Sequence, residues 1–178
     1  MSCIMYIASD VPLKERKNPH EFTLSVNEAL ALGIEDIPEF MLKEGFDRDK
    51  KDVLLYADRE VNIDVDSGVI EDGNFADDFA VWLREKDSQM PTEKKYCAEV
   101  EWLRFTPERG AMLIEYLKEQ LENADSIELW YGWLGEEVKG VEMKRIALAE
   151  LKPEDIEKLE KMEVWQEPLI HYGYILTK

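Results

Sequence analysis

The chain has 178 residues, of which 45% are hydrophobic, enough to bury the core of one domain, and we predict a single domain over residues 1–178. Its 40 acidic and 22 basic residues give a formal charge of −18, which repels phosphate backbones and anionic lipid headgroups and argues against nucleic-acid and membrane partners. The first residues lack the segments of a signal peptide, and no apolar run approaches the roughly 20 residues that span a bilayer, so we expect a cytoplasmic protein.

The first part of the chain predicts short strands separated by helical turns. Strands are predicted over 3–9, 22–26, 52–58 and 61–66, where β-branched and aromatic residues are frequent or apolar and polar residues alternate. Ser25, followed three residues later by Glu28, is typical of a capping box and predicts a helical turn. Pro at the front and Gly at the back predict a second turn over 38–45.

The remaining chain predicts one long helix among strands. Thr106 can cap this helix and Pro107 suits its first position, and an apolar stripe follows, formed by Met112, Leu113, Tyr116, Leu117 and Leu121. Strands are predicted in the second half of 75–83 and over 96–102, 127–134, 141–148 and 169–176, with a short helix over 153–162. The predicted fold class is α+β, a mainly antiparallel sheet packed against one long amphipathic helix plus short helices.

The segments "CIMYIASDVPL", "IELWYGWLGEE" and "KRIALAELKPEDI", with an apolar helix between the first two, resemble a family of uncharacterised bacterial cytosolic proteins, a domain of unknown function. The resemblance implies a bacterial cytosolic domain and supplies no catalytic residue. Relatives of this kind often carry a glycine- and cysteine-rich run after the second strand. Here "ADREVNIDVDSGVIEDGNF" has Gly68 and Gly73 but no cysteine, so no thiol or metal role is expected there.

Motifs for cofactor and metal chemistry are missing from the sequence. There is no GxGxxG, GxxxxGK[ST] or GxSxG pattern, and His20 and His171 are too far apart for a zinc helix, so no cofactor is predicted. The acidic stretch over 58–78 fails as an EF-hand, because a register starting at Asn62 places Ser67 sixth and Gly73 twelfth. We predict no metal site, although a weak divalent-cation site stays open if these carboxylates line up across strands.

Cys97 and His171 are the residues to weigh for catalysis. Cys97 shares a strand face with Glu99 and Glu101, whose carboxylates disfavour the thiolate, so an inert cysteine is predicted. A pair between Cys97 and His171 or His20 stays open, since the fold could join them. His171 lies between apolar neighbours and is expected to be a structural, hydrogen-bonded residue. No catalytic residue is assigned.

The stretch "SIELWYGWLGEE" holds the predicted binding residues. On a strand, one face is expected to be core, formed by Ile127, Leu129, Tyr131 and Trp133. Trp130 lies on the other face with Glu128. With Trp102 or Trp82, Trp130 could form an apolar protein-binding patch rimmed by Glu128, Glu136 and Glu137. The alternative is that a second layer of the structure buries Trp130.

Two function classes follow from these residues. The first is a non-enzymatic, acidic, cytosolic interaction protein that docks a basic protein partner, for example as an immunity protein or inhibitor steered by charge. The second is a small hydrolase or transferase that uses carboxylates and His171 in a cleft. A homodimer through an exposed sheet face is a further open arrangement.

Overall fold

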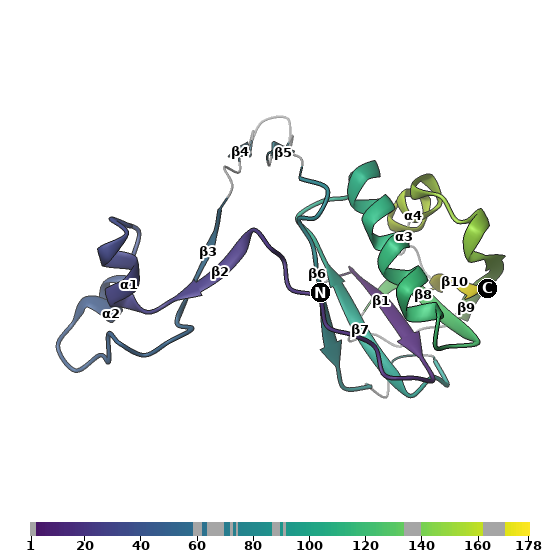
Figure 1. Cartoon of the computed structure of the whole chain (residues 1–178), viewed down its shortest axis with the longest axis horizontal. Helices are drawn as coiled ribbons and strands as arrows, with labels where there is room; N and C mark the ends of the chain where they lie inside the picture. Colours follow the sequence, from purple (N-terminus) through teal and green to yellow (C-terminus); the bar gives the residue numbers. More distant parts are fainter. Residues whose placement is uncertain are drawn as a thin grey trace. The chain divides into compact units, whose positions relative to one another are not determined.

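The computed structural model describes residues 3–58, 62–63, 70–71, 73, 75–86, 90, 92–133, 140–161 and 170–178. The chain divides into two compact units (Figure 1). Unit 1 consists of Met1–Asn18 and Asn74–Lys178, and unit 2, Pro19–Gly73, is inserted between them. The prediction of a single domain did not separate the two units, because no linker-like change in composition marks the insertion.

Unit 1 is built on a six-stranded sheet in the order β6-β7-β1-β8-β10-β9. Its elements are β1 (Cys3–Ser9), β6 (Ala80–Arg84), β7 (Tyr96–Glu101), α3 (Pro107–Leu121), β8 (Ser126–Trp133), β9 (Gly140–Ala147), η1 (Leu148–Glu150), α4 (Pro153–Glu160) and β10 (Ile170–Thr177). Neighbouring strands are antiparallel except β9 and β10, which are parallel and between which the chain forms α4. This sheet and the long helix α3 confirm the predicted α+β class.

Helix α3 begins where the sequence predicts. Thr106 adopts an extended backbone and its hydroxyl accepts a hydrogen bond from the backbone N–H of Arg109 at 3.2 Å, while Pro107 takes the first helical position. The apolar stripe is buried through Leu113, Leu117 and Leu121. Met112 is 37% exposed, so its assignment to that buried stripe was wrong. It directly precedes the buried Leu113 and lies at the margin of the buried face of the helix.

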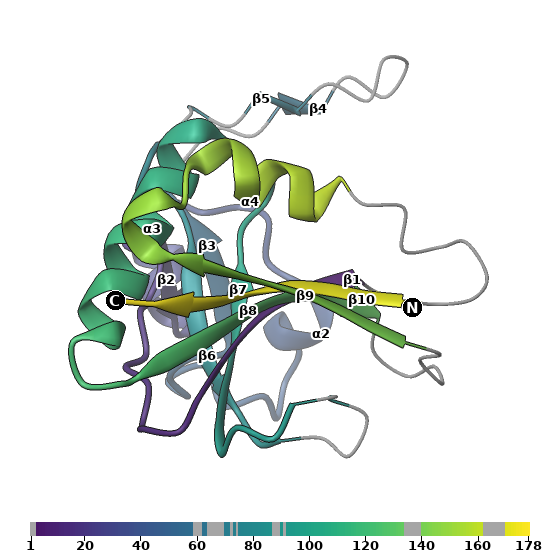
Figure 2. The same ribbon diagram turned by 90° about the vertical axis from the view of Figure 1, so that its right-hand side faces the viewer.

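Helices α3 and α4 lie on one face of the sheet, here called the inner face (Figure 2). The alternation of each strand sends every second side chain into the core between these helices and the sheet. The sheet contributes to this core Met5, Ile7, Val81, Ala98, Val100, Ile127, Leu129, Tyr174 and Leu176. The opposite, outer face carries the residues between them, including Trp130.

A buried ion pair lies next to the two chain segments that connect unit 1 to unit 2, one ending at Asn18 and the other beginning at Asn74. Arg109 of α3, which is 0% exposed, donates to the Asp78 carboxylate at 2.8 Å. The side-chain amide of Asn18 donates to the same carboxylate at 2.7 Å. Arg109 also donates to the backbone oxygens of Phe75 at 3.2 Å and Arg104 at 3.0 Å. Asn18 and Asp78 are thus held together although 60 positions separate them in the chain.

Unit 2 is small and has a small core of its own. Its elements are β2 (Glu21–Leu24), α1 (Val26–Ala31), α2 (Glu39–Leu42), β3 (Leu54–Ala57), β4 (Asn62–Ile63) and β5 (Ile70–Glu71). Strands β2 and β3 pair antiparallel, as do β4 and β5. The predicted capping box of α1 is confirmed, since Glu28 N–H donates to the Ser25 hydroxyl and Ser25 N–H donates to the Glu28 carboxylate at 2.7 Å. The predicted strand over 61–66 lies largely outside the described residues.

Candidate functional site

Trp130 lies on the outer face of the sheet, as its position in β8 predicts, but it is buried. Its side chain is 5% exposed and packs with Tyr6, Ala8 and Cys97, with Met90 and Met143 packed against this cluster. The exposed aromatic patch considered for Trp130 is therefore not present at this residue. The alternative prediction, burial beneath a second layer, describes the arrangement found.

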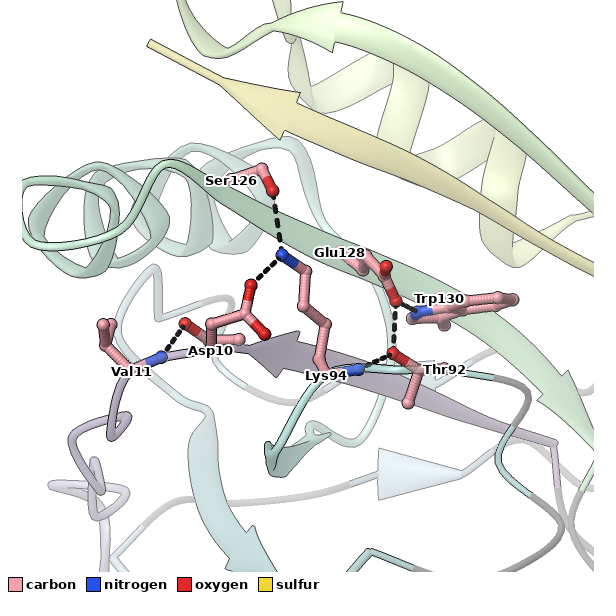
Figure 3. Close-up of polar contacts among 8 residues, drawn as sticks. Asp10, Val11, Thr92, Lys94, Ser126, Glu128 and Trp130 are labelled. Carbon is pink, nitrogen blue, oxygen red and sulfur yellow. Dashed lines mark hydrogen bonds and ion pairs between the residues drawn. The ribbon is translucent and has the colours of Figure 1, made fainter.

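Glu128 is engaged in a polar network that fixes this second layer (Figure 3). One carboxylate oxygen accepts from the Trp130 indole N–H at 2.9 Å and from the Thr92 hydroxyl at 2.6 Å. Thr92 also accepts from the backbone N–H of Lys94 at 3.1 Å, and the Lys94 ammonium donates to the Ser126 hydroxyl at 2.9 Å. Charge-assisted hydrogen bonds of this kind attach the segment around Thr92 to β8. The network gives Glu128 a structural role.

The other two predicted rim residues, Glu136 and Glu137, lie outside the described residues, and their part in binding stays a prediction. The two tryptophans considered as neighbours of Trp130 are placed elsewhere. Trp102 packs edge-to-face on Phe79 and Phe105 on the helix side of the sheet, with ring centroids 6.2 and 6.0 Å apart. Trp82 lies on the outer face, but the register places Glu99 and Tyr6 between it and Trp130.

His171 is buried beside Trp130 and has no room for a substrate. Its side chain is 4% exposed, and its ring meets the Trp130 ring edge-to-face at 6.3 Å. A Cβ atom at Gly132 would lie 2.5 Å from the His171 ring, so the ring occupies the space that glycine leaves open. The adjoining cavity offers about 10 Å³ to the centre of a water molecule, roughly the space that one water needs.

Cys97 lines the same cavity, but the register separates it from His171. Cys97 pairs with Ala8, Ala8 with Glu128, and Glu128 with Ile175. The row of Cys97 therefore reaches β10 four residues from His171 and three strand spacings away, roughly 14 Å across the sheet. The two residues do not form a catalytic pair. Burial raises the pKa of the Cys97 thiol, Lys86 lowers it and Glu128 raises it further, so the thiol form is favoured.

The described part of the acidic stretch over 58–78 does not form a metal site. Asp78 is buried in the ion pair with Arg109. No group of three or more His, Cys, Asp or Glu side chains suited to a metal ion occurs among the residues that the structure describes. The residues predicted to form the solvent-facing side of a strand, Asn62, Asp64 and Asp66, have side chains outside the described part of the structure.

Unit 2 presents a surface that the sequence analysis did not single out. Among its described residues, the large exposed apolar side chains outnumber the four buried core residues. These exposed side chains are Phe22, Leu30, Leu32, Phe40, Leu42 and Leu55. Two of them flank three exposed carboxylates in one short segment, "LGIEDIPEF". We call this segment the acidic loop and define its exposed residues as Leu32, Glu35, Asp36, Glu39 and Phe40.

The acidic loop is held in place from within unit 2. Gly33 ends α1 with φ of +75°, a conformation that suits glycine, and the next N–H, of Ile34, donates back to Ala29 at 3.0 Å. Ile37 inserts into the unit 2 core and is 7% exposed. The Phe40 ring packs edge-to-face on Phe46 at 6.1 Å. With Ile37 anchored, the side chains on both sides of it face solvent.

The acidic loop carries three exposed carboxylates. Within the described residues no ion pair joins Glu35, Asp36 or Glu39 to a cation. Residues 19–58 contain ten acidic and four basic side chains, so a negative field extends over the whole described part of unit 2. Apolar residues scattered among acids give no helical or strand periodicity, so the sequence pattern does not single them out. The signal that could have found them is their position from the end of α1 to the first turn of α2.

No family model, no curated protein and no solved structure matches this chain. No helix in the described part of the chain has both the length and the apolar character needed to cross a membrane.

Proposed function

We propose that this protein is a non-enzymatic interaction protein, and that the acidic loop of unit 2 docks a basic protein partner. The observation that carries the proposal is the combination of Leu32 and Phe40, 64% and 59% exposed, with three exposed carboxylates between them that form no ion pair with a described residue. Exposed large apolar side chains gathered among polar ones are typical of protein interaction sites. Phe40 would serve as the aromatic anchor and the carboxylates as the polar rim.

The charge of the chain supports a cationic partner. A formal charge of −18 attracts a basic protein over the distance of a Debye length and raises the rate of encounter, while like-charged proteins are repelled. An immunity protein or inhibitor that masks a cationic enzyme is one concrete form of this function. The cavity beside Trp130 and His171 is water-sized, so it gives no support to a substrate cleft at His171.

The same proposal includes a cytoplasmic address. Cys97 is a free, buried cysteine, and a reducing compartment keeps such thiols unpaired. Partly unfolded states of this chain would expose the Cys97 thiol. In a reducing compartment this exposure does not lead to disulfide-linked chains.

The test is capture of a partner by matched variants of the tagged full-length protein in native lysate. Leu32→Ser with Phe40→Ser removes the apolar side chains of the acidic loop. Leu83→Ser with Phe75→Ser makes the same chemical change at exposed positions of unit 1, 51% and 41% exposed. Bound proteins are identified by mass, eluted with increasing salt and then purified for direct titration against each variant.

The expected result is a basic protein that binds the wild type and the unit 1 control in a fixed ratio and is released as salt rises. Loss of both apolar residues should weaken its binding at least tenfold, since burying two such side chains contributes about 1.5–3 kcal/mol each. A partner that binds the Leu32/Phe40 variant as tightly as the wild type would exclude the acidic loop as the site. A partner that is acidic, or whose binding ignores salt, would refute the role of charge.

A further inference from the structure

The two edges of the six-stranded sheet differ. At the β6 edge, the backbone of Arg16 pairs with Val81, with N–H···O distances of 3.0 and 2.8 Å. The other edge is β9, which is eight residues long and has β10 as its one strand neighbour in the part of the chain that the structure describes. A long strand with one free side carries backbone donors and acceptors that can pair with another strand.

The side chains of β9 divide between the two faces of the sheet. Glu142 and Lys144 pair with Tyr172 and Tyr174, so they lie on the inner face. Met143 lies between them on the outer face and covers Gly173, where a Cβ atom would come within 2.7 Å of the Met143 sulfur. Glu142 and Lys144 are both exposed, and no ion pair joins either of them to another described residue.

The charges of Glu142 and Lys144 in one copy of β9 complement the same charges in a second, antiparallel copy. When two copies of β9 run antiparallel about a twofold axis at Met143, Glu142 of each copy lies opposite Lys144 of the other, on the same face. The ladder extends over seven residue pairs, from Gly140 opposite Ile146 to Ile146 opposite Gly140. Each opposite-charge pair stabilises the contact by roughly 0.2–1 kcal/mol. The hydrogen bonds of the backbone ladder stabilise it further.

The neighbouring registers are disfavoured by the same two charges. A shift of two residues in one direction places Glu142 opposite Glu142, and a shift in the other direction places Lys144 opposite Lys144. A shift of one residue would send the apolar and charged side chains of the second copy to the wrong faces. One register therefore satisfies both the faces and the charges.

From these features we propose that the edge of β9 binds a second copy of the same chain, so that the two six-stranded sheets join into one continuous sheet through an antiparallel β9–β9 contact centred on Met143. The proposal is independent of the function proposed for the acidic loop, because it concerns the chain alone in solution.

The test is the molar mass of the purified full-length chain near physiological salt, where the repulsion between two chains of charge −18 is screened beyond about 8 Å. Sedimentation is measured up to millimolar protein concentration. We expect a species of twice the 20.8 kDa chain mass.

Lys144→Glu and Glu142→Lys should each shift this dimer to the monomer, because each substitution creates two like-charge contacts. The double variant Glu142→Lys with Lys144→Glu should restore the dimer, and Lys118→Glu, an equal charge change on exposed α3, should leave it intact.

Disulfide trapping gives a second measurement that does not depend on charge. In a background with Cys3 replaced by serine, Met143→Cys places two cysteines directly opposite each other, within the Cα separation of 4.4–6.8 Å that a disulfide requires. Arg145→Cys pairs opposite Val141 instead, so its two copies are too far apart. Crosslinking at 143 and not at 145 is expected.

Four results would overturn the proposal. They are a wild-type chain that stays monomeric throughout, a dimer unaffected by Lys144→Glu, a charge-swapped variant that stays monomeric, and equal crosslinking at both positions.

Discussion

Replacing Arg109 by alanine should destabilise unit 1 more than any exposed charge substitution. The guanidinium is fully buried and donates to the Asp78 carboxylate at 2.8 Å, and that carboxylate belongs to a residue only 1% exposed. Arg109→Ala leaves this charge in the protein interior with the Asn18 amide as one remaining donor. Breaking a buried ion pair from one side costs about 3–5 kcal/mol.

The backbone contacts of Arg109 add to this loss. The carbonyl oxygens of Phe75 and Arg104 each lose the hydrogen bond from the guanidinium, although Phe75 still accepts from the backbone N–H of Asp78, and each lost hydrogen bond costs about 0.5–1.5 kcal/mol. These contributions are not additive, and we expect a total near 4 kcal/mol. Domains of this size are stable by about 5–15 kcal/mol, so Arg109→Ala should remain folded only marginally.

The assay is urea unfolding followed by tryptophan fluorescence, which reports on unit 1 alone. All five tryptophans lie in unit 1: Trp82, Trp102, Trp130, Trp133 and Trp165. With a slope of about 2 kcal/mol per molar urea, the midpoint should fall by about 2 M. Arg84→Ala is the matched control, because Arg84 pairs with Glu99 at 2.6 Å but its side chain is 52% exposed.

The control should lose less than about 1 kcal/mol, as exposed ion pairs do. Arg109→Lys keeps the charge without the planar fork of donors and should fall between the two alanine variants. If Arg109→Ala and Arg84→Ala lowered the midpoint equally, the argument that burial sets the strength of the Asp78 contact would be refuted.

Two further predictions concern the outer face of the sheet. Gly132→Ala should destabilise unit 1 by about 1–3 kcal/mol, since its Cβ would lie 2.5 Å from the His171 ring; a urea midpoint equal to that of the wild type would show that the ring can move aside freely. Cys97, whose thiol pKa is raised by burial, should resist an electrophile at neutral pH and react in urea, in a background where Cys3 is serine; rapid labelling of the folded protein would contradict its assignment as an inert cysteine.

Local sequence signals predicted much of unit 1. The cap at Thr106, the proline after it and the apolar stripe define α3 within one segment, and the alternation of β8 places Ile127 and Leu129 in the core. These features depend on neighbouring residues, so a single sequence contains them. The parallel pairing of β9 with β10 depends on contacts between segments about 30 residues apart, and no local pattern specifies it.

The candidate site was harder to predict for the same reason. Alternation assigns Trp130 to the outer face, but it does not say what covers that face. The cover comes from Met90 and from Thr92, which is 36 positions from its partner Glu128. In the acidic loop the decisive fact is that Ile37 enters the core of unit 2 while Leu32 and Phe40 stay exposed. The segment has four apolar residues within nine positions, Leu32, Ile34, Ile37 and Phe40. They look equivalent in sequence, and tertiary packing determines which of them are buried.

Small size offers a competing explanation for the exposed apolar residues of unit 2, because a small unit cannot cover all of its apolar surface. The two explanations separate at the carboxylates. Replacing Glu35, Asp36 and Glu39 by their amides removes like-charge repulsion, so amide hydrogen exchange in α1 should be unchanged or slower. If the acidic loop is a docking surface, the same variant should bind its basic partner more weakly and with a smaller salt dependence. The three carboxylates lower stability through their mutual repulsion but strengthen binding through their attraction to the partner. Unchanged binding would leave size as the sufficient explanation.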